Sequence, residues 1–240
     1  MTTTKNLSKT FARRSGGIES YLQRIFALMF AAVGVTAVAA WATMATPLFG
    51  LLFTNTGMSG LYYVLMFGGL ALSIWAQVRA FSMKPAMAIA MLFGYAALIG
   101  IVMTPLILVA ITHNPWTILM AFALAAVMFA CMALFGYKTV KNLSFLGVFL
   151  MMGMIGLILV GLASFIWPAM LGGAFGTIVC LIGVLVFALF TAYDMQTLKN
   201  AYAAGGDDTM KNQLAVLGAL HLYISFIAMF QYLLSLLNRD

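Results

Sequence analysis

The sequence predicts an all-α polytopic membrane protein with seven transmembrane helices. Of its 240 residues, 65% are hydrophobic and 7% are charged, and the mean hydropathy is +1.09. So few charges cannot form the polar surface that a soluble domain needs. Apolar runs of about 18 residues or more recur from residue 25 onward, each long enough to cross a hydrocarbon core of about 30 Å as a helix. The alternating pattern of membrane barrel strands is not present.

The N-terminal segment, residues 1–20, is polar and basic, and we predict a cytoplasmic arm there. Together with the apolar run that follows, it has some features of a secretory signal peptide. The run from Ile25 to Met44 is longer than the core of such a peptide, however, and further apolar runs follow it. We therefore interpret this run as the first transmembrane helix.

Helix-breaking residues bound the remaining helices. Pro47, Pro115 and Pro168 fall at predicted ends, whereas Pro105 lies inside the third helix, where a proline removes one backbone hydrogen bond and kinks the segment. Gly205 and Gly206 are a stop signal, and the two aspartates after them are a start signal. The predicted helices cover about residues 22–46, 61–81, 86–111, 116–136, 144–166, 173–198 and 212–237.

The basic residues indicate the orientation of the chain. Eleven of the twelve lysines and arginines lie on the N-terminal side, in the arm, near helix ends or in alternate loops, and Arg239 lies on the other side. The positive-inside rule then places the N-terminus in the cytoplasm and, with seven spans, the C-terminus outside. This distribution also explains the net charge of +7 without nucleic acid as a partner.

The sequence points to neither a cofactor nor a confident metal site. Cys131 and Cys180 both fall inside predicted membrane helices, so a disulfide framework is not indicated. His113 and His221 lie far apart in the sequence, and no cluster of histidine and cysteine residues has metal-ligand spacing.

The candidate functional residues lie on the last two helices. Asp194 is the only acidic residue inside an apolar segment, and placing it in lipid costs about 2.5–3.5 kcal/mol or more, so it must be paired, hydrated or functional. Helical spacing puts Asp194 on one face with small and polar residues, and puts His221 and Ser225 on a similar face of the next helix. We expect the two faces to meet. Arg79, at the cytoplasmic end of the second helix, is the best candidate for a cationic partner of Asp194.

Each of these residues also has a purely structural interpretation. Asp194 could be an interfacial residue that faces water, and His221 a hydrogen-bonded residue of the bundle. Ser225 alone would be assigned to packing, and Arg79 to topology. Against the interfacial interpretation, a carboxylate near a helix C-terminus meets the unfavourable end of the macrodipole unless a cation compensates.

Four sequence motifs resemble the bacterial branch of the Bax inhibitor-1 family, the transmembrane BAX-inhibitor-motif proteins. They are YDMQ in the sixth helix, GALxLYxxFIxxF in the seventh, the loop GYKTVKNLS and the segment PLILV. The resemblance covers about residues 20–237 and implies a seven-helix bundle with the last helix at its centre. It also implies a pH-sensitive calcium leak, in which two aspartates share a proton and form a latch with an arginine.

The family pattern is only partly present in this chain. Asp194 matches the first aspartate and Arg79 matches the arginine, but Ser225 stands where the second aspartate belongs. His221 lies one turn earlier, where the family has a small or hydroxyl residue. The paired-carboxylate sensor is therefore absent, and Asp194 alone offers weak contact to a cation, because Ca²⁺ sites gather about 6–8 oxygen ligands.

Two functional hypotheses follow, both for a multi-pass protein of the bacterial inner (plasma) membrane. The first is a pH-sensitive leak for calcium ions or protons through the lipid bilayer, gated by Asp194, Arg79, His221 and Ser225. The alternative is a membrane-embedded interaction protein that modulates membrane proteolysis or a stress response, with a membrane protease as its partner. An intramembrane enzyme is disfavoured, because hydrolysis would need two carboxylates, a metal motif or a nucleophile–base pair with an oxyanion site.

Overall fold

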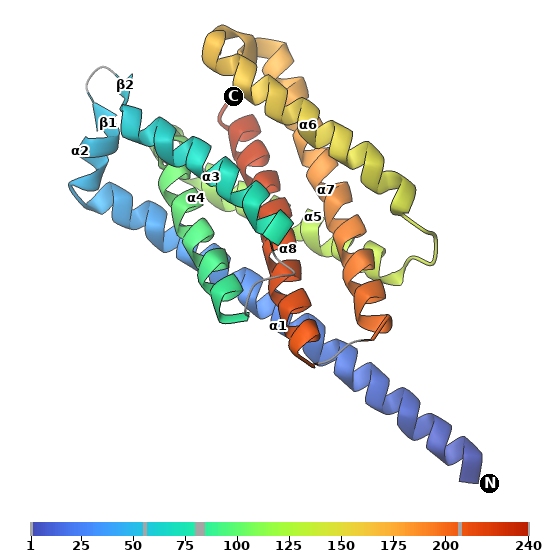
Figure 1. The fold of residues 1–240 in the computed structure, drawn as a ribbon. Coiled ribbons are helices and arrows are strands. Elements are labelled where there is room, and N and C mark those ends of the chain that lie inside the picture. The colour runs from blue at the N-terminus through green and yellow to red at the C-terminus, as the bar shows by residue number, and fades with distance from the viewer. Residues whose placement is uncertain (1, 55–56, 80–84, 206–207, 240) are drawn as a thin grey trace.

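The computed structural model describes the backbone of residues 2–54, 57–79, 85–205 and 208–239. Within these ranges it describes side chains from residue 17 onward, apart from positions 74, 76–79, 85, 168, 208 and 209. The described part of the chain is almost entirely helical (Figure 1). Its elements are α1 (Thr2–Ala45), α2 (Leu48–Leu52), β1 (Phe53–Thr54), β2 (Gly57–Met58), α3 (Gly60–Arg79), α4 (Pro85–His113), α5 (Trp116–Lys138), α6 (Ser144–Ile166), η2 (Pro168–Leu171), α7 (Gly173–Ala203) and α8 (Asp208–Leu237).

Most helix ends agree with the predicted ones, and α6 agrees at both ends. The first helix differs, because α1 begins at Thr2 and includes the segment predicted as an arm. No proline interrupts that segment, so the helix continues beyond the apolar part of the chain. Helix α7 also runs five residues past its predicted end and stops just before Gly205, whose φ of +84° is the left-handed conformation expected of a helix stop.

Six of the described helices are long and apolar enough to cross a membrane. The apolar part of α3 for which side chains are described, Gly60–Ser73, is shorter, although the α3 backbone spans 20 residues, or about 30 Å. An all-α polytopic membrane fold is therefore confirmed. The seventh span and the orientation of the two termini stay predictions.

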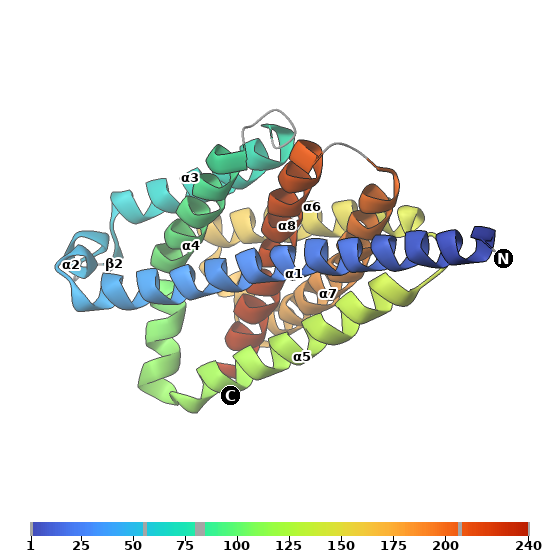
Figure 2. The same ribbon diagram turned by 90° about the horizontal axis from the view of Figure 1, so that it is seen from below.

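Helix α8 is the centre of the bundle. It packs against α1, α4, α5 and α7, and Figures 1 and 2 show these helices arranged around it. In its most apolar stretch 72% of the residues are buried, whereas the other five candidate spans reach at most 39%. The predicted central position of the last helix is therefore confirmed.

A polar contact joins α8 to α1 and α4 inside this apolar core. The Thr36 hydroxyl of α1 lies 2.7 Å from the Tyr223 hydroxyl of α8 and 3.1 Å from the Ala96 carbonyl oxygen of α4. Tyr95 of α4 meets the Tyr223 ring edge to face at 6.0 Å. Because a polar group in a membrane core must find its partner inside the protein, these contacts allow Tyr223 to be fully buried.

Glycines allow close contact between α7 and its neighbours. Gly147 and Gly153 of α6 and Gly183 of α7 have side chains of neighbouring helices directly against them, as is common for small residues between membrane helices. Gly136 of α5 is in direct contact with the α7 backbone at Ala192. Gly156, by contrast, has open space around it.

Alanine substitutions at two glycines should separate close packing from helix propensity. We expect Gly136→Ala to lower the melting temperature of the purified protein in detergent, because its Cβ would collide with backbone atoms of Ala192, which cannot move aside. Gly156→Ala has open space and should keep or raise stability, since alanine favours a helix by about 1 kcal/mol over glycine. Equal melting temperatures for the two variants would contradict the close α5–α7 contact.

The predicted orientation can be tested with fusions to the C-terminus. Seven spans and a cytoplasmic N-terminus require the C-terminus to lie outside the cytoplasm. A C-terminal alkaline phosphatase should therefore be active, and a green fluorescent protein in the same position should be dark. The opposite pair of results would place the C-terminus in the cytoplasm and would contradict the predicted combination of seven spans and a cytoplasmic N-terminus.

Candidate functional site

The two faces predicted to carry polar and small residues do meet along α7 and α8. Leu198 packs against Gly218 at one end of the contact, and the rings of Phe187 and Tyr232 are 6.1 Å apart toward the other end. Asp194 lies between these two contacts, facing α8. The helical spacing in the sequence thus predicted the correct surfaces.

Asp194 is buried, with 8% of its surface exposed, so the interfacial interpretation of this residue is wrong. Its helix continues for nine residues to Ala203, or about 14 Å. Because the effect of the helix dipole falls off within the last turn, the expected penalty from the α7 C-terminus does not apply. The burial of the carboxylate must be offset by its side-chain neighbours or by water.

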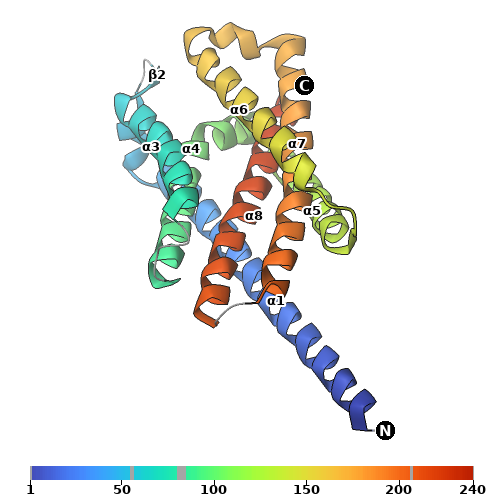
Figure 3. The ribbon, with the colours of Figure 1, turned by 45° about the vertical axis from the view of Figure 1, so that its right-hand side comes forward.

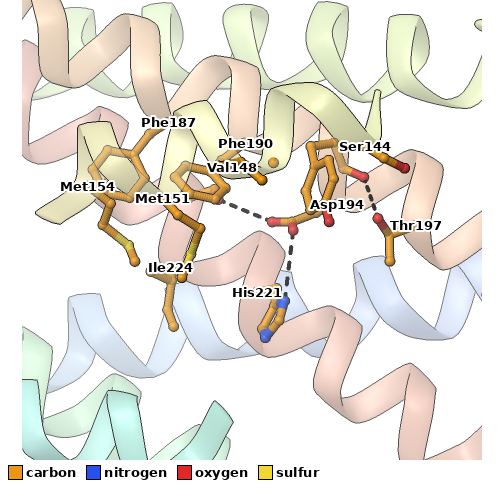
Figure 4. A pocket seen from close by; sticks show the side chains of 13 residues that line it. Ser144, Val148, Met151, Met154, Phe187, Phe190, Asp194, Thr197, His221 and Ile224 are labelled. Carbon is orange, nitrogen blue, oxygen red and sulfur yellow. Dashed lines mark hydrogen bonds and ion pairs between the residues drawn. The ribbon is translucent and has the colours of Figure 1, made fainter. Parts of the chain in front are cut away.

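Two of the predicted residues flank the carboxylate. The Ser225 hydroxyl donates to Asp194 Oδ2 over 3.5 Å, and His221 Nδ1 lies 3.8 Å from Asp194 Oδ1 (Figure 4). Strong N–H···O bonds to charged groups span about 2.7–2.9 Å, so neither contact is tight. His221 Nε2 is also buried and has no hydrogen-bond partner in the described part of the chain. The cluster therefore has unused hydrogen-bonding capacity on both the acid and the base.

The carboxylate faces a cavity of about 410 Å³ between α6, α7 and α8. Figure 4 shows Asp194 and His221 on one side of it and the α6 side chains Val148, Met151 and Met154 on another. The polar residues that line the cavity are Ser144, Tyr193, Asp194, Thr197, His221 and Ser225. A buried carboxylate therefore borders open space between three helices.

Arg79 ends α3, but its side chain lies outside the described part of the structure. The predicted pair between Arg79 and Asp194 therefore stays a prediction.

Gln196 is a site residue that the sequence interpretation missed. It is buried, accepts a 2.8 Å hydrogen bond from the Leu143 backbone N–H and donates one of 2.8 Å to the Lys141 carbonyl oxygen. Lys199 adds a 2.8 Å bond to the Tyr137 carbonyl oxygen. The C-terminal part of α7 is thus hydrogen-bonded to the loop before α6. These bonds fix the start of α6, which forms one wall of the cavity. The sequence did contain a signal for this contact, because Gln196 is part of the YDMQ motif and its partners are part of the GYKTVKNLS motif.

The arrangement differs from that of a serine hydrolase. In such an enzyme the imidazole lies between the hydroxyl and the carboxylate and takes the proton from serine. Here the carboxylate lies between Ser225 and His221. Such a cluster can bind or pass a proton, or hold a cation, but it does not activate a nucleophile. Among the described residues no group of three or more histidine, cysteine or acidic side chains could hold a metal ion.

The rate of tryptic cleavage in the loop before α6 should show whether Gln196 restrains this loop. We expect Gln196→Ala to be cut faster after Lys138 and Lys141, because the loop loses two hydrogen bonds of roughly 1 kcal/mol each. Thr197→Ala is the matched control, since the Thr197 hydroxyl bonds only within its own helix, to the Tyr193 carbonyl oxygen. Cleavage can be measured over time by gel electrophoresis. Equal cleavage rates for the two variants would contradict this role of Gln196.

Comparison with known proteins gives consistent matches over nearly the whole chain. A family model described as inhibitor of apoptosis-promoting Bax1 matches residues 18–240. The chain is 31% identical to the inner membrane protein YbhL of Escherichia coli over 236 residues, covering 97% of each protein. It is 33% identical to an uncharacterized protein of Caulobacter vibrioides over 235 residues, 93% of this chain and 91% of the relative.

A third relative, the uncharacterized protein RP147 of Rickettsia prowazekii, is 30% identical over 239 residues, 99% of this chain and 95% of the relative. These matches agree with the family that the four sequence motifs indicate. The chain is a multi-pass protein of the inner membrane, and it belongs to the Bax inhibitor-1 family.

Proposed function

We propose that this protein is a pH-sensitive cation leak whose gate is the cluster of Asp194, His221 and Ser225. The observation that carries the proposal is the buried carboxylate of Asp194, which faces a cavity inside the bundle and has only long contacts to its two neighbours. Ionisable side chains inside membrane proteins are rare and usually mark ion or proton pathways. Packing alone would not require a carboxylate there.

The gate responds to protons through the balance of charge around Asp194. In the closed state the ionised carboxylate is held by cationic or hydrogen-bonding partners, and Arg79 is the predicted one from α3. Protonation of Asp194 removes the negative charge, and protonation of His221 introduces a cation that competes for it. Tyr193 is the other titratable group in the cavity. Acidification should therefore loosen the closed state.

Protons are the better candidate for the conducted cation, and calcium is the second. Ca²⁺ usually binds about 6–8 oxygen ligands, and a single carboxylate with one hydroxyl supplies few of them. A proton needs only a chain of groups that can accept and donate it, and carboxylate, imidazole and hydroxyl groups all do so.

A second candidate function rests on α1. Its N-terminal part extends away from the bundle (Figures 1 and 3) and carries Lys5, Lys9, Arg13 and Arg14 in its sequence. A projecting basic helix suits contact with a partner protein, for instance a membrane protease. In that case the polar cluster would serve the stability of the fold.

Flux through liposomes of purified protein should test the gate. For the wild type we expect proton flux to rise as the pH falls from 8 to 5. Asp194→Asn resembles the protonated acid and should leak at all pH values in that range, with its pH dependence reduced. His221→Gln should weaken the pH response and keep the basal flux. Flux can be followed with a pH-sensitive dye, and Ca²⁺ flux with a calcium dye in parallel.

Two comparisons decide between the candidates. Equal flux from wild type and Asp194→Asn at every pH would refute the gate. Removal of residues 2–16 should leave flux unchanged if the leak is the function, and it should abolish partner capture if α1 is the functional element. Thr197→Ala, which changes a polar residue that lines the same cavity but bonds only within its helix, controls for general effects on the cavity.

A further inference from the structure

The cavity beside Asp194 has the features of a ligand site in addition to those of a gate. Its carboxylate is nine-tenths buried, yet the only contacts among the described side chains are the 3.5 Å and 3.8 Å ones to Ser225 and His221. An ionised carboxylate offers about four acceptor positions. The remaining positions have no partner among the described side chains, and Asp194 lines the cavity, so a donor inside the cavity could reach them.

The cavity changes from polar to apolar along its length. Ser144 begins α6 and Thr197 lies near the end of α7, so these hydroxyls mark one end. Asp194 lies one turn further in. Beyond it the walls are apolar, with Met151 and Met154 of α6 and Phe187 of α7. Phe187 is ten residues from Thr197, or about 15 Å along the helix.

The apolar wall opens to the outside of the bundle. Val148 and Met151 line the cavity, and 67% and 50% of their surfaces are exposed. Both lie within α6, a candidate membrane span, so we expect this opening to face lipid. An amphiphile dissolved in the bilayer could therefore enter sideways between helices.

We propose that this cavity binds an amphiphilic ammonium ion, an alkyl chain that carries one positively charged amine. The ammonium has three N–H donors, and Asp194, the Ser225 hydroxyl and an unprotonated ring nitrogen of His221 are three acceptors grouped on one side. The alkyl chain lies along Met151, Met154 and Phe187. The volume of about 410 Å³ falls within the range of roughly 300–1,000 Å³ that is usual for small-molecule sites.

The charge of the ligand gives the site its selectivity. A neutral alkyl alcohol of the same length would gain the apolar contacts but would leave the carboxylate without a counter-charge. Hydrogen bonds to charged groups contribute about 1.5–3 kcal/mol, which corresponds to roughly tenfold or more in affinity. The inference uses the cavity of the proposed leak but does not require any ion to cross the membrane. Binding and flux can therefore fail separately.

Binding of radiolabelled dodecylamine to the full-length protein in phosphatidylcholine nanodiscs at pH 8 would test the proposal, with empty nanodiscs to subtract partitioning into lipid. We expect saturable binding that unlabelled dodecylamine displaces at least tenfold better than dodecanol. Asp194→Asn should weaken binding about tenfold, and Met151→Trp, which fills the apolar half of the cavity, should do the same. Met152→Trp is the matched control, because Met152 is 68% exposed and does not line the cavity.

The outcomes are distinguishable even if one variant is unstable. Met151 and Met152 are both exposed on α6, so elution and melting temperature should match between the two tryptophan variants. Addition of phosphatidylethanolamine to the nanodiscs separates two sources of the amine. Displacement by this lipid assigns the site to a lipid headgroup, and no displacement assigns it to a free alkylamine. Equal displacement by dodecanol and dodecylamine, or wild-type affinity in both Asp194→Asn and Met151→Trp, would overturn the proposal.

Discussion

The arrangement of this protein depends on one constraint, which is that a polar group in a hydrocarbon environment must be satisfied inside the bundle. Helix α8 satisfies the constraint on two sides. On one side, Tyr223 is hydrogen-bonded to Thr36 of α1, whose hydroxyl also lies within hydrogen-bond distance of the α4 backbone. On the other, Ser225 and His221 face Asp194 of α7. The first side is completely buried, and the second borders a cavity. Helix α8 thus lies between a polar contact that is fully buried and a polar contact that borders a cavity.

The motif resemblance implies that Ser225 stands where the family has a second aspartate, and this difference changes what the cluster can do. Two carboxylates in contact would share a proton because both cannot be ionised easily at short distance. A hydroxyl beside one carboxylate removes that repulsion and leaves a charge that a cation or a histidine can balance. His221 lies one helical turn before Ser225 and is within 3.8 Å of the acid. This chain therefore has an acid with a neighbouring histidine where the motif resemblance implies a pair of acids.

Much of the fold could be predicted from the sequence, because apolar length and helix-breaking residues act locally. The bounds of α6 and the stop at Gly205 are examples. The extension of α1 to Thr2 could not be predicted from hydropathy, because a helix in water and an arm without structure are equally polar. Facing surfaces of α7 and α8 followed from spacing. The bonds of Gln196 to the loop before α6 join residues more than 50 positions apart, and no local pattern encodes such a pairing.

The central position of α8 has a consequence for biogenesis. Chains are made from the N-terminus, so the helix against which four others pack leaves the ribosome after all four of them. Until then, Asp194 and the Thr36 hydroxyl lack their α8 partners, and the nascent helices must be kept from associating wrongly in the bilayer. The insertion machinery, or the short connections between α4, α5 and α6, must therefore prevent the earlier helices from filling the position of α8 before α8 is synthesised.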